Sequence, residues 1–139
     1  MTTLPLTGGC LCGGVRFELT EAPVSASWCH CTRCQRRTGT NASLQARFPA
    51  TALRILQGEE LLREYEPPDS YAKVFCSTCG SSLWSRSPAG DVVAVRFGVF
   101  DSDPGIRPQY HQFVAYAPVW DTIPDDGLPR YPERVPPSA

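Results

Sequence analysis

Short runs of alternating apolar and polar residues dominate the first hundred positions of the chain. Residues 15–19 read Val-Arg-Phe-Glu-Leu, the alternation typical of a strand with one buried face. Runs of similar length recur between turns that contain proline or glycine, such as residues 67–69 and 88–91. Residues 92–97 are rich in β-branched side chains, which favour strands. We therefore predict strands over residues 15–19, 43–48, 54–56, 61–65, 71–75, 83–84 and 92–97.

Only residues 32–38 have helical character. Thr32 is the expected N-cap, because threonine is one of the residues preferred there. Gly39 is the expected stop, because glycine often terminates helices. The last third holds eight of the fourteen prolines, between Pro104 and Pro137, so we predict an extended surface segment without a regular element. Residues 135–139 are expected to fray. The pattern as a whole predicts a mainly β domain over residues 1–139, with one short helix.

Composition narrows the class of protein. A chain of 139 residues with 42% hydrophobic content folds as one domain, marginally stable without a staple. No apolar run approaches the roughly 18 residues of a membrane span, and no secretory signal is visible, so we expect a cytoplasmic protein that does not contact membranes. The net charge of −1 makes a nucleic-acid partner unfavourable. Twelve of the thirteen basic residues are arginine. Arginine favours planar, bidentate recognition of carboxylates, but the codon usage of a GC-rich genome is sufficient to explain the excess.

Seven cysteines fall into three clusters along the chain. They lie at residues 10 and 12, at residues 29, 31 and 34, and at residues 76 and 79. Thiolates two or three residues apart bind soft tetrahedral metals, of which zinc is the usual one. The odd number of cysteines and the reducing compartment both disfavour disulfides. Seven ligands indicate two zinc sites, one closed with four thiolates and one open with three.

The closed site is expected to combine the first and last clusters. Cys76 and Cys79 precede Gly80, the arrangement of a zinc knuckle, in which the glycine takes a left-handed turn. Cys10 and Cys12 are the natural second pair, because residues two apart on an extended chain face the same side. Joining these distant pairs through a metal would staple a small domain.

The middle cluster then holds Cys29, Cys31 and Cys34 without a fourth cysteine. Three protein ligands and one open position are typical of a zinc ion that takes part in catalysis. Cys34 is expected in the first turn of the helix, where backbone N–H groups and the helix dipole favour a thiolate. His30 lies between two of these cysteines and should point the other way, so packing or hydrogen bonding is favoured over ligation. His111 is expected to be structural.

Three arginines lie beside the middle cluster. Their guanidinium groups would offset the negative charge of a zinc ion with three thiolates, or would bind the carboxylates of an acidic ligand. Solvated surface residues are the alternative interpretation for at least two of them. These candidate substrate-binding residues are Arg33, Arg36 and Arg37.

The chain resembles the glutathione-dependent formaldehyde-activating (GFA) family, whose domain is shared with centromere protein V. The residues that carry the resemblance are 8–17, 29–39, 75–83, 97–101, 108–120 and 127–130, and all seven cysteines take part. The resemblance implies a zinc-stapled β-tent fold with two Zn²⁺ per chain. Its pattern assigns the structural zinc to Cys10, Cys12, Cys76 and Cys79, and the catalytic zinc to Cys29, Cys31 and Cys34.

The resemblance also implies an activity. The namesake reaction joins formaldehyde to glutathione to give S-(hydroxymethyl)glutathione, which would make this chain a carbon–sulfur lyase-type protein acting on a small thiol and a small aldehyde. The open zinc would bind the thiol as a thiolate or polarise the aldehyde oxygen. Two alternatives stay open: a carrier that binds glutathione or its adduct without catalysis, and a zinc-stapled interaction module. The sequence sets no oligomeric state.

Overall fold

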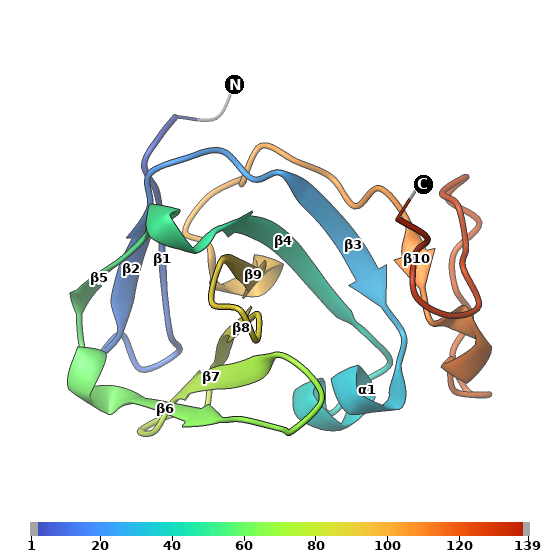
Figure 1. The fold of residues 1–139 in the computed structure, drawn as a ribbon, viewed down its shortest axis with the longest axis horizontal. Helices are drawn as coiled ribbons and strands as arrows, with labels where there is room; N and C mark the ends of the chain where they lie inside the picture. Colours follow the sequence, from blue (N-terminus) through green and yellow to red (C-terminus); the bar gives the residue numbers. More distant parts are fainter. Residues whose placement is uncertain (1–2, 138–139) are drawn as a thin grey trace. The chain divides into compact units, whose positions relative to one another are not determined.

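The computed structural model describes residues 3–137 and is mainly β with one α-helix, as the sequence pattern predicts (Figure 1). Short strands make up most of the elements, and single-turn 3₁₀ helices (η) follow some of them. In chain order the elements are β1 (Leu6–Gly9), β2 (Arg16–Leu19), β3 (Ser25–Cys29), α1 (Thr32–Thr38), β4 (Ser43–Pro49), η1 (Ala50–Ala52), β5 (Leu53–Gln57), η2 (Glu59–Leu61), β6 (Leu62–Tyr65), β7 (Ala72–Cys76), β8 (Ser82–Arg86), β9 (Val92–Arg96), η3 (Phe97–Val99), β10 (His111–Gln112) and η4 (Val114–Tyr116).

The chain divides into two compact units. The first comprises the residues up to Ser25 together with Ala46–Ile106, and the second comprises Ala26–Gln45 together with the residues from Arg107 onward. Along the sequence, the boundaries between the units fall within β3, within β4 and between Ile106 and Arg107. Each unit contains whole cysteine clusters: the first and last clusters belong to the first unit, and the middle cluster belongs to the second.

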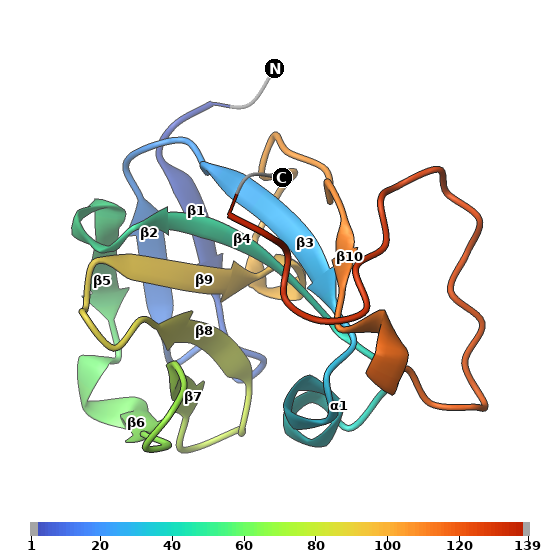
Figure 2. The same cartoon turned by 45° about the vertical axis from the view of Figure 1, so that its right-hand side comes forward.

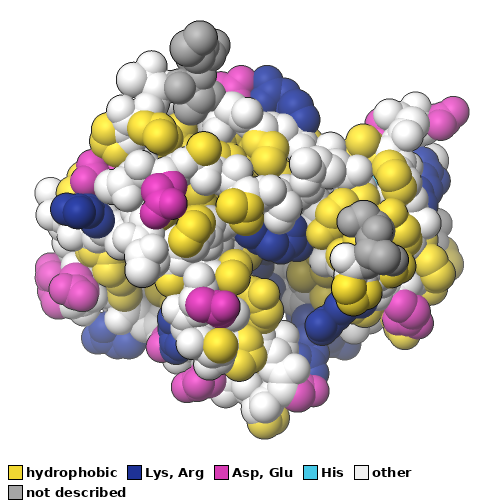
Figure 3. All heavy atoms as spheres, turned by 45° about the horizontal axis from the view of Figure 1, so that its top comes forward, with side chains coloured by type: hydrophobic (Ala, Val, Ile, Leu, Met, Phe, Trp, Pro, Cys, Tyr) yellow, Lys and Arg dark blue, Asp and Glu magenta, His cyan; other side chains and the backbone are white. Residues whose placement is uncertain are grey.

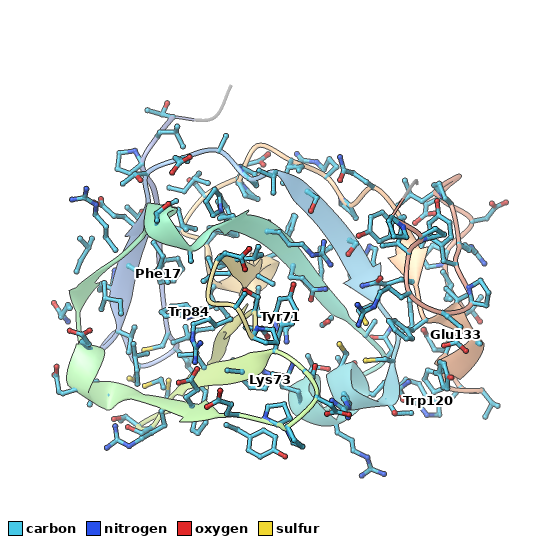
Figure 4. The ribbon with its side chains drawn as sticks, viewed as in Figure 1. Phe17, Tyr71, Lys73, Trp84, Trp120 and Glu133 are labelled. Carbon is cyan, nitrogen blue, oxygen red and sulfur yellow. The ribbon has the colours of Figure 1, made fainter. Side chains whose placement is uncertain are left out.

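In the first unit, β1, β2 and β5 form one antiparallel sheet, and β9, β8, β7 and β6 lie side by side in a second set of antiparallel strands. The rings of Phe17 and Trp84 point toward each other in the core, with centroids 5.4 Å apart in an edge-to-face contact (Figure 4). Phe100 packs on the same Phe17 ring at 6.4 Å. The alternation predicted for residues 15–19 is seen directly, because Phe17 and Leu19 are fully buried and the intervening Glu18 is not.

Strand β1 was not predicted, because two of its four residues are glycines, which are poor strand formers. Its pairing with β2 explains the glycines. A Cβ on Gly8 would lie 2.3 Å from the carbonyl oxygen of Val99 and 2.6 Å from the ring of Phe17. Packing against the aromatic core therefore requires a residue without a side chain at this position, and tertiary contact overrides local propensity.

The second unit corrects two sequence predictions. Helix α1 begins at Thr32, but its N-cap is Cys31, whose Sγ accepts the backbone N–H of Cys34 at 3.3 Å. The C-terminal part was predicted to lack regular structure. It nevertheless forms β10, parallel to β3, and the single turn η4. Figures 1 and 2 both show β10 beside β3.

The sequence predicts that residues 135–139 fray. Of these, residues 138 and 139 lie outside the described part of the chain. At the start of this segment, the backbone N–H of Val135 donates to the side-chain oxygen of Gln112 at 3.2 Å. The tail is therefore tied to β10 at its first residue, through a buried glutamine side chain.

The surface carries charges of both signs. On the face shown in Figure 3, acidic and basic side chains are interspersed among hydrophobic and uncharged ones. Within residues 3–137, no helix has the length and apolar character needed to cross a membrane.

The turn at Gly58 offers a test of the first unit's packing. Its φ is +81°, and a Cβ there would lie 2.1 Å from the carbonyl oxygen of Gly14, a backbone atom that cannot move aside cheaply. We expect Gly58→Ala to lower the free energy of unfolding by about 3 kcal/mol, from left-handed strain plus overpacking. Gly90→Ala is the control, because φ is +77° there but the space is open. This control should lower the free energy of unfolding by about 1 kcal/mol, as measured by urea titration. Equal losses for the two variants would contradict the clash at Gly58.

Candidate metal centres

The first centre lies in the first unit, where four cysteine sulfurs converge. The Sγ atoms of Cys10, Cys12, Cys76 and Cys79 all lie within 4.8 Å of one another. The Sγ of Cys12 is 3.5 Å from that of Cys10 and 3.9 Å from that of Cys76. A tetrahedral zinc ion with Zn–S bonds of about 2.3 Å separates its sulfurs by about 3.8 Å. Four thiols at these spacings therefore fit one tetrahedral metal ion.

Two tight turns hold these sulfurs. In the turn after β1, the N–H of Gly13 donates to the carbonyl of Cys10, and the N–H of Val15 donates to the Cys10 sulfur at 3.2 Å. In the turn after β7, the N–H of Gly80 donates to the carbonyl of Cys76 at 2.8 Å. Both glycines have φ of +78°, the left-handed conformation that the sequence predicted for Gly80. Each turn is thus closed by a hydrogen bond within its own backbone.

Ser81 links the two turns and favours a thiolate. Its hydroxyl oxygen accepts the backbone N–H of Leu11 at 2.9 Å, which leaves its own hydrogen for the sulfur of Cys79 at 3.2 Å. This hydroxyl, followed by the backbone N–H groups of Ser81 and Cys12, lowers the pKa of Cys79 to about 5. Metal binding requires deprotonated sulfur, so a thiol with a pKa below neutrality is ready to coordinate. Sequence reasoning missed Ser81, although a hydroxyl two residues after a knuckle cysteine was visible.

The second centre lies in the second unit, where three cysteine sulfurs converge. The Sγ atoms of Cys29, Cys31 and Cys34 lie within 4.8 Å of one another. Cys29 ends β3 and is buried, Cys31 caps α1, and Cys34 lies in the first turn of that helix. Within residues 3–137, no histidine, aspartate or glutamate joins this group at that distance. Among the described residues, the donor set of this group is therefore three soft sulfurs.

Three thiols this close cannot all ionise without a cation among them. Hydrogen bonds to the sulfurs of Cys31 and Cys34, followed by burial, raise the pKa of Cys29 well above its ordinary value. A divalent cation reverses this penalty, because it draws the thiolates together and neutralises most of their charge. The chemistry of the donor set therefore fits zinc, which prefers sulfur and nitrogen ligands in tetrahedral sites.

The three arginines of α1 lie next to Cys34 in sequence and flank it on the helix. Arg33 and Arg36 are exposed, and Arg37 is half-buried. Arg36 and Arg37 belong to the last turn, where a positive charge stabilises the C-terminal end of a helix. Their location on the helix is compatible with both interpretations, solvated surface residues and contact with an acidic ligand.

The partners in two further contacts of the second unit could not be found from the sequence. The side-chain amide of Gln35 donates to the backbone carbonyls of His30 and Tyr116, both at 2.9 Å, and so ties α1 to the end of β3 and to η4. His30 is 3% exposed, and its Nε2 lies 2.9 Å from Nδ1 of His111, which realises the predicted hydrogen-bonding role. Burial, followed by the charge of His111, lowers the pKa of His30. No sequence signal pairs residues this far apart along the chain.

The chain is similar to known proteins in sequence and in fold. A family model described as glutathione-dependent formaldehyde-activating enzyme matches residues 5–116, a stretch that includes all seven cysteines. Among solved structures, the fold is similar to the crystal structure of a Rhodobacter sphaeroides protein determined as a structural-genomics target. That protein is 23% identical, with a TM-score of 0.59 over 90% of this chain and 98% of the other. At this identity the likeness concerns the fold alone.

Proposed function

The chain belongs to the glutathione-dependent formaldehyde-activating enzyme family, and on that premise we propose that it is a zinc-dependent carbon–sulfur lyase acting on a thiol–aldehyde adduct. The substrate we propose is S-(hydroxymethyl)glutathione, formed from glutathione and formaldehyde. One observation carries the proposal: three cysteine sulfurs converge in the second unit, and no described histidine, aspartate or glutamate completes the group. A zinc ion bound by these three sulfurs would keep its fourth position for a ligand. A reducing cytoplasm would keep all seven thiols free, and no disulfide occurs among the described residues.

The two clusters would hold zinc in different roles. Cys10, Cys12, Cys76 and Cys79 offer four sulfurs and so would close the coordination of a structural ion that staples the first unit. Cys29, Cys31 and Cys34 would hold a second ion with one position open. A zinc ion bound there supplies Lewis acidity and stabilises a substrate thiolate at neutral pH. Two ions per chain are therefore expected, with the whole chain acting as one domain.

The residues around the second cluster would bind and orient the adduct. Glutathione carries two carboxylates, and Arg33, Arg36 and Arg37 on α1 offer planar guanidinium groups that pair with carboxylates in bidentate fashion. Gln35 holds the start of α1 against the end of β3 and against η4, so the cysteine sulfurs and the arginines are kept on a fixed frame. An ordered frame reduces the entropy lost when the substrate is positioned.

The bond changes are simple. In the joining direction, the sulfur of glutathione forms a bond to the carbon of formaldehyde, and the carbon–oxygen double bond becomes a single bond. The hydrogen lost from the thiol ends on that oxygen, which becomes the hydroxyl of the hydroxymethyl group. The reverse direction breaks the same carbon–sulfur bond, and neither direction requires an oxidant or a reductant.

Native mass spectrometry tests this proposal. We expect two zinc ions per chain, and a glutathione adduct that appears only when the second ion is bound. Exchange spectroscopy on mixtures of glutathione and formaldehyde then measures whether the protein speeds interconversion beyond the uncatalysed rate. Saturable binding without acceleration would indicate a carrier instead. A single firmly held zinc ion with no response to glutathione would overturn the enzyme proposal and leave a stapled scaffold.

A further inference from the structure

The hydroxyl group of Ser81 lies between the two turns that carry the sulfurs of the first centre. Its Oγ accepts the backbone N–H of Leu11 at 2.9 Å and lies 3.2 Å from Sγ of Cys79. Leu11 stands between Cys10 and Cys12 in the chain, whereas Cys79 belongs to the turn after β7. One oxygen atom therefore contacts both halves of the four-sulfur cluster, across 70 positions of sequence.

The backbone of Ser81 is fixed by the hairpin of β7 and β8. Its carbonyl accepts the N–H of Cys76 at 3.1 Å, and the next residue, Ser82, pairs with Phe75 in the ladder between the two strands. The residue itself is half-buried. Because groups on rigid elements are placed more precisely than groups on loops, the Ser81 hydroxyl is a fixed point against which a neighbouring turn can be held.

The turn after β1 needs such a point beyond its first cysteine. Cys10 is tied to Val15, because its N–H donates to the Val15 carbonyl at 3.2 Å and its sulfur accepts the Val15 N–H at 3.2 Å. Leu11 and Cys12 lie beyond that pair and are exposed. The hydrogen bond from Leu11 to Ser81 therefore holds the exposed part of the turn, with its cysteine, against the turn that carries the other two sulfurs.

We propose that Ser81 is a positioning residue of the first centre, which docks the turn of Cys10 and Cys12 onto the turn of Cys79 and so raises the affinity of the centre for zinc. The inference rests on the proposed function only for the presence of a structural ion. Ligands already held in place lose less conformational entropy when the ion binds. Residues that orient metal ligands from outside the coordination shell are worth about 10–100-fold in metal affinity.

Ser81→Ala removes the oxygen and keeps the backbone of the hairpin. We expect zinc binding at the first centre to weaken by at least about tenfold, with the second centre unchanged. Native mass spectrometry of the full chain during a chelator titration counts the ions that remain. Ser81→Thr keeps a hydroxyl group at this position and should keep the wild-type affinity. Ser77→Ala is the matched control, because it removes a hydroxyl group from an exposed residue of the same turn.

Cadmium-113 spectra of the full chain assign the effect to one centre. Thiolates bind soft metal ions such as Cd²⁺ as they bind zinc, and correlations to the cysteine Hβ protons identify which centre each resonance reports. In folded, cadmium-loaded Ser81→Ala we expect the resonance of the first centre to shift and that of the second to stay. A loss of packing away from the sulfurs would move neither resonance.

The amide of Leu11 gives a test that needs no variant. Leu11 is 87% exposed, so its amide would exchange freely with deuterium if it bonded only to water. In the zinc-loaded wild type, the bond to Ser81 should slow this exchange at least about tenfold relative to an unstructured peptide of the same sequence. Exchange at the peptide's rate would overturn the docking.

The remaining outcomes separate this inference from the proposed function. Equal zinc retention in Ser81→Ala and Ser77→Ala, or an unshifted first-centre resonance, would overturn the positioning role and leave both zinc ions in place. A wild-type chain that binds no ion through the four cysteines of the first centre would overturn the proposed structural ion, and the positioning role with it. Weakened binding at the first centre alone, with full occupancy of the second, would support the role of Ser81.

Discussion

Replacing Cys76 with serine will abolish cooperative folding of the first unit. Cys76 is fully buried at the end of β7, and its sulfur belongs to the four-sulfur cluster that joins the turn after β1 to the turn after β7. Structural zinc binding is worth about 10–16 kcal/mol in small metal-dependent domains. The net stability of a whole domain is about 5–15 kcal/mol. Removing one ligand is therefore expected to cost as much as the whole free energy of unfolding. Thermal unfolding monitored by near-ultraviolet circular dichroism should lose its sigmoidal transition.

The matched control for this experiment is Ser77→Ala. Ser77 is the exposed neighbour of Cys76, and its backbone N–H, which donates to the carbonyl of Leu61 at 2.8 Å, survives the substitution. This variant should keep both zinc ions and its unfolding transition. A strong chelator added to wild-type protein should reproduce the serine variant. Cooperative unfolding of Cys76→Ser, with its zinc count reduced by one, would show that the first centre does not staple the fold.

Local pattern predicted the strands that have one buried face and missed those that depend on distant partners. Residues 15–19 alternate in the sequence because one sheet face is buried, and β2 follows that alternation. Strand β3 reads Ser-Ala-Ser-Trp-Cys, whose small residues carry little strand propensity. Strand β10 has two residues and exists through its parallel pairing with β3, some eighty positions earlier in the chain. No window of sequence contains that information.

The same distinction explains the helix cap and the two centres. Cys31 rather than Thr32 caps α1, because its sulfur is aimed at the Cys34 N–H within the same cluster, a contact that propensity scales do not weigh. The cysteine clusters could be grouped from the sequence, because cysteines two or three residues apart are a recognisable pattern of metal ligands. The hydrogen bonds from Asp126 through His111 to His30 could not, because His30 and His111 lie 81 positions apart and Asp126 lies another 15 positions on, in an irregular loop.

Replacing Cys31 with serine will remove the second zinc ion while α1 stays folded. Serine is a preferred N-cap residue, so its hydroxyl can accept the Cys34 N–H that the Cys31 sulfur accepts in the wild type. The serine hydroxyl does not ionise at neutral pH, and loss of a direct ligand should weaken metal binding by at least about 100-fold, since even outer partners of metal ligands are worth 10–100-fold. Native mass spectrometry should count one zinc ion, with far-ultraviolet circular dichroism unchanged.

Adduct binding and any acceleration of glutathione–formaldehyde exchange should disappear with that ion, because the open fourth position exists only when the three thiolates hold a metal. Thr32→Ser is the matched control: it alters the adjacent, exposed first residue of α1 and leaves all three thiols in place. The control should retain two zinc ions and full activity. A Cys31→Ser variant with two zinc ions and undiminished exchange would contradict the assignment of the second centre, since catalysis would then run without one of its three sulfurs.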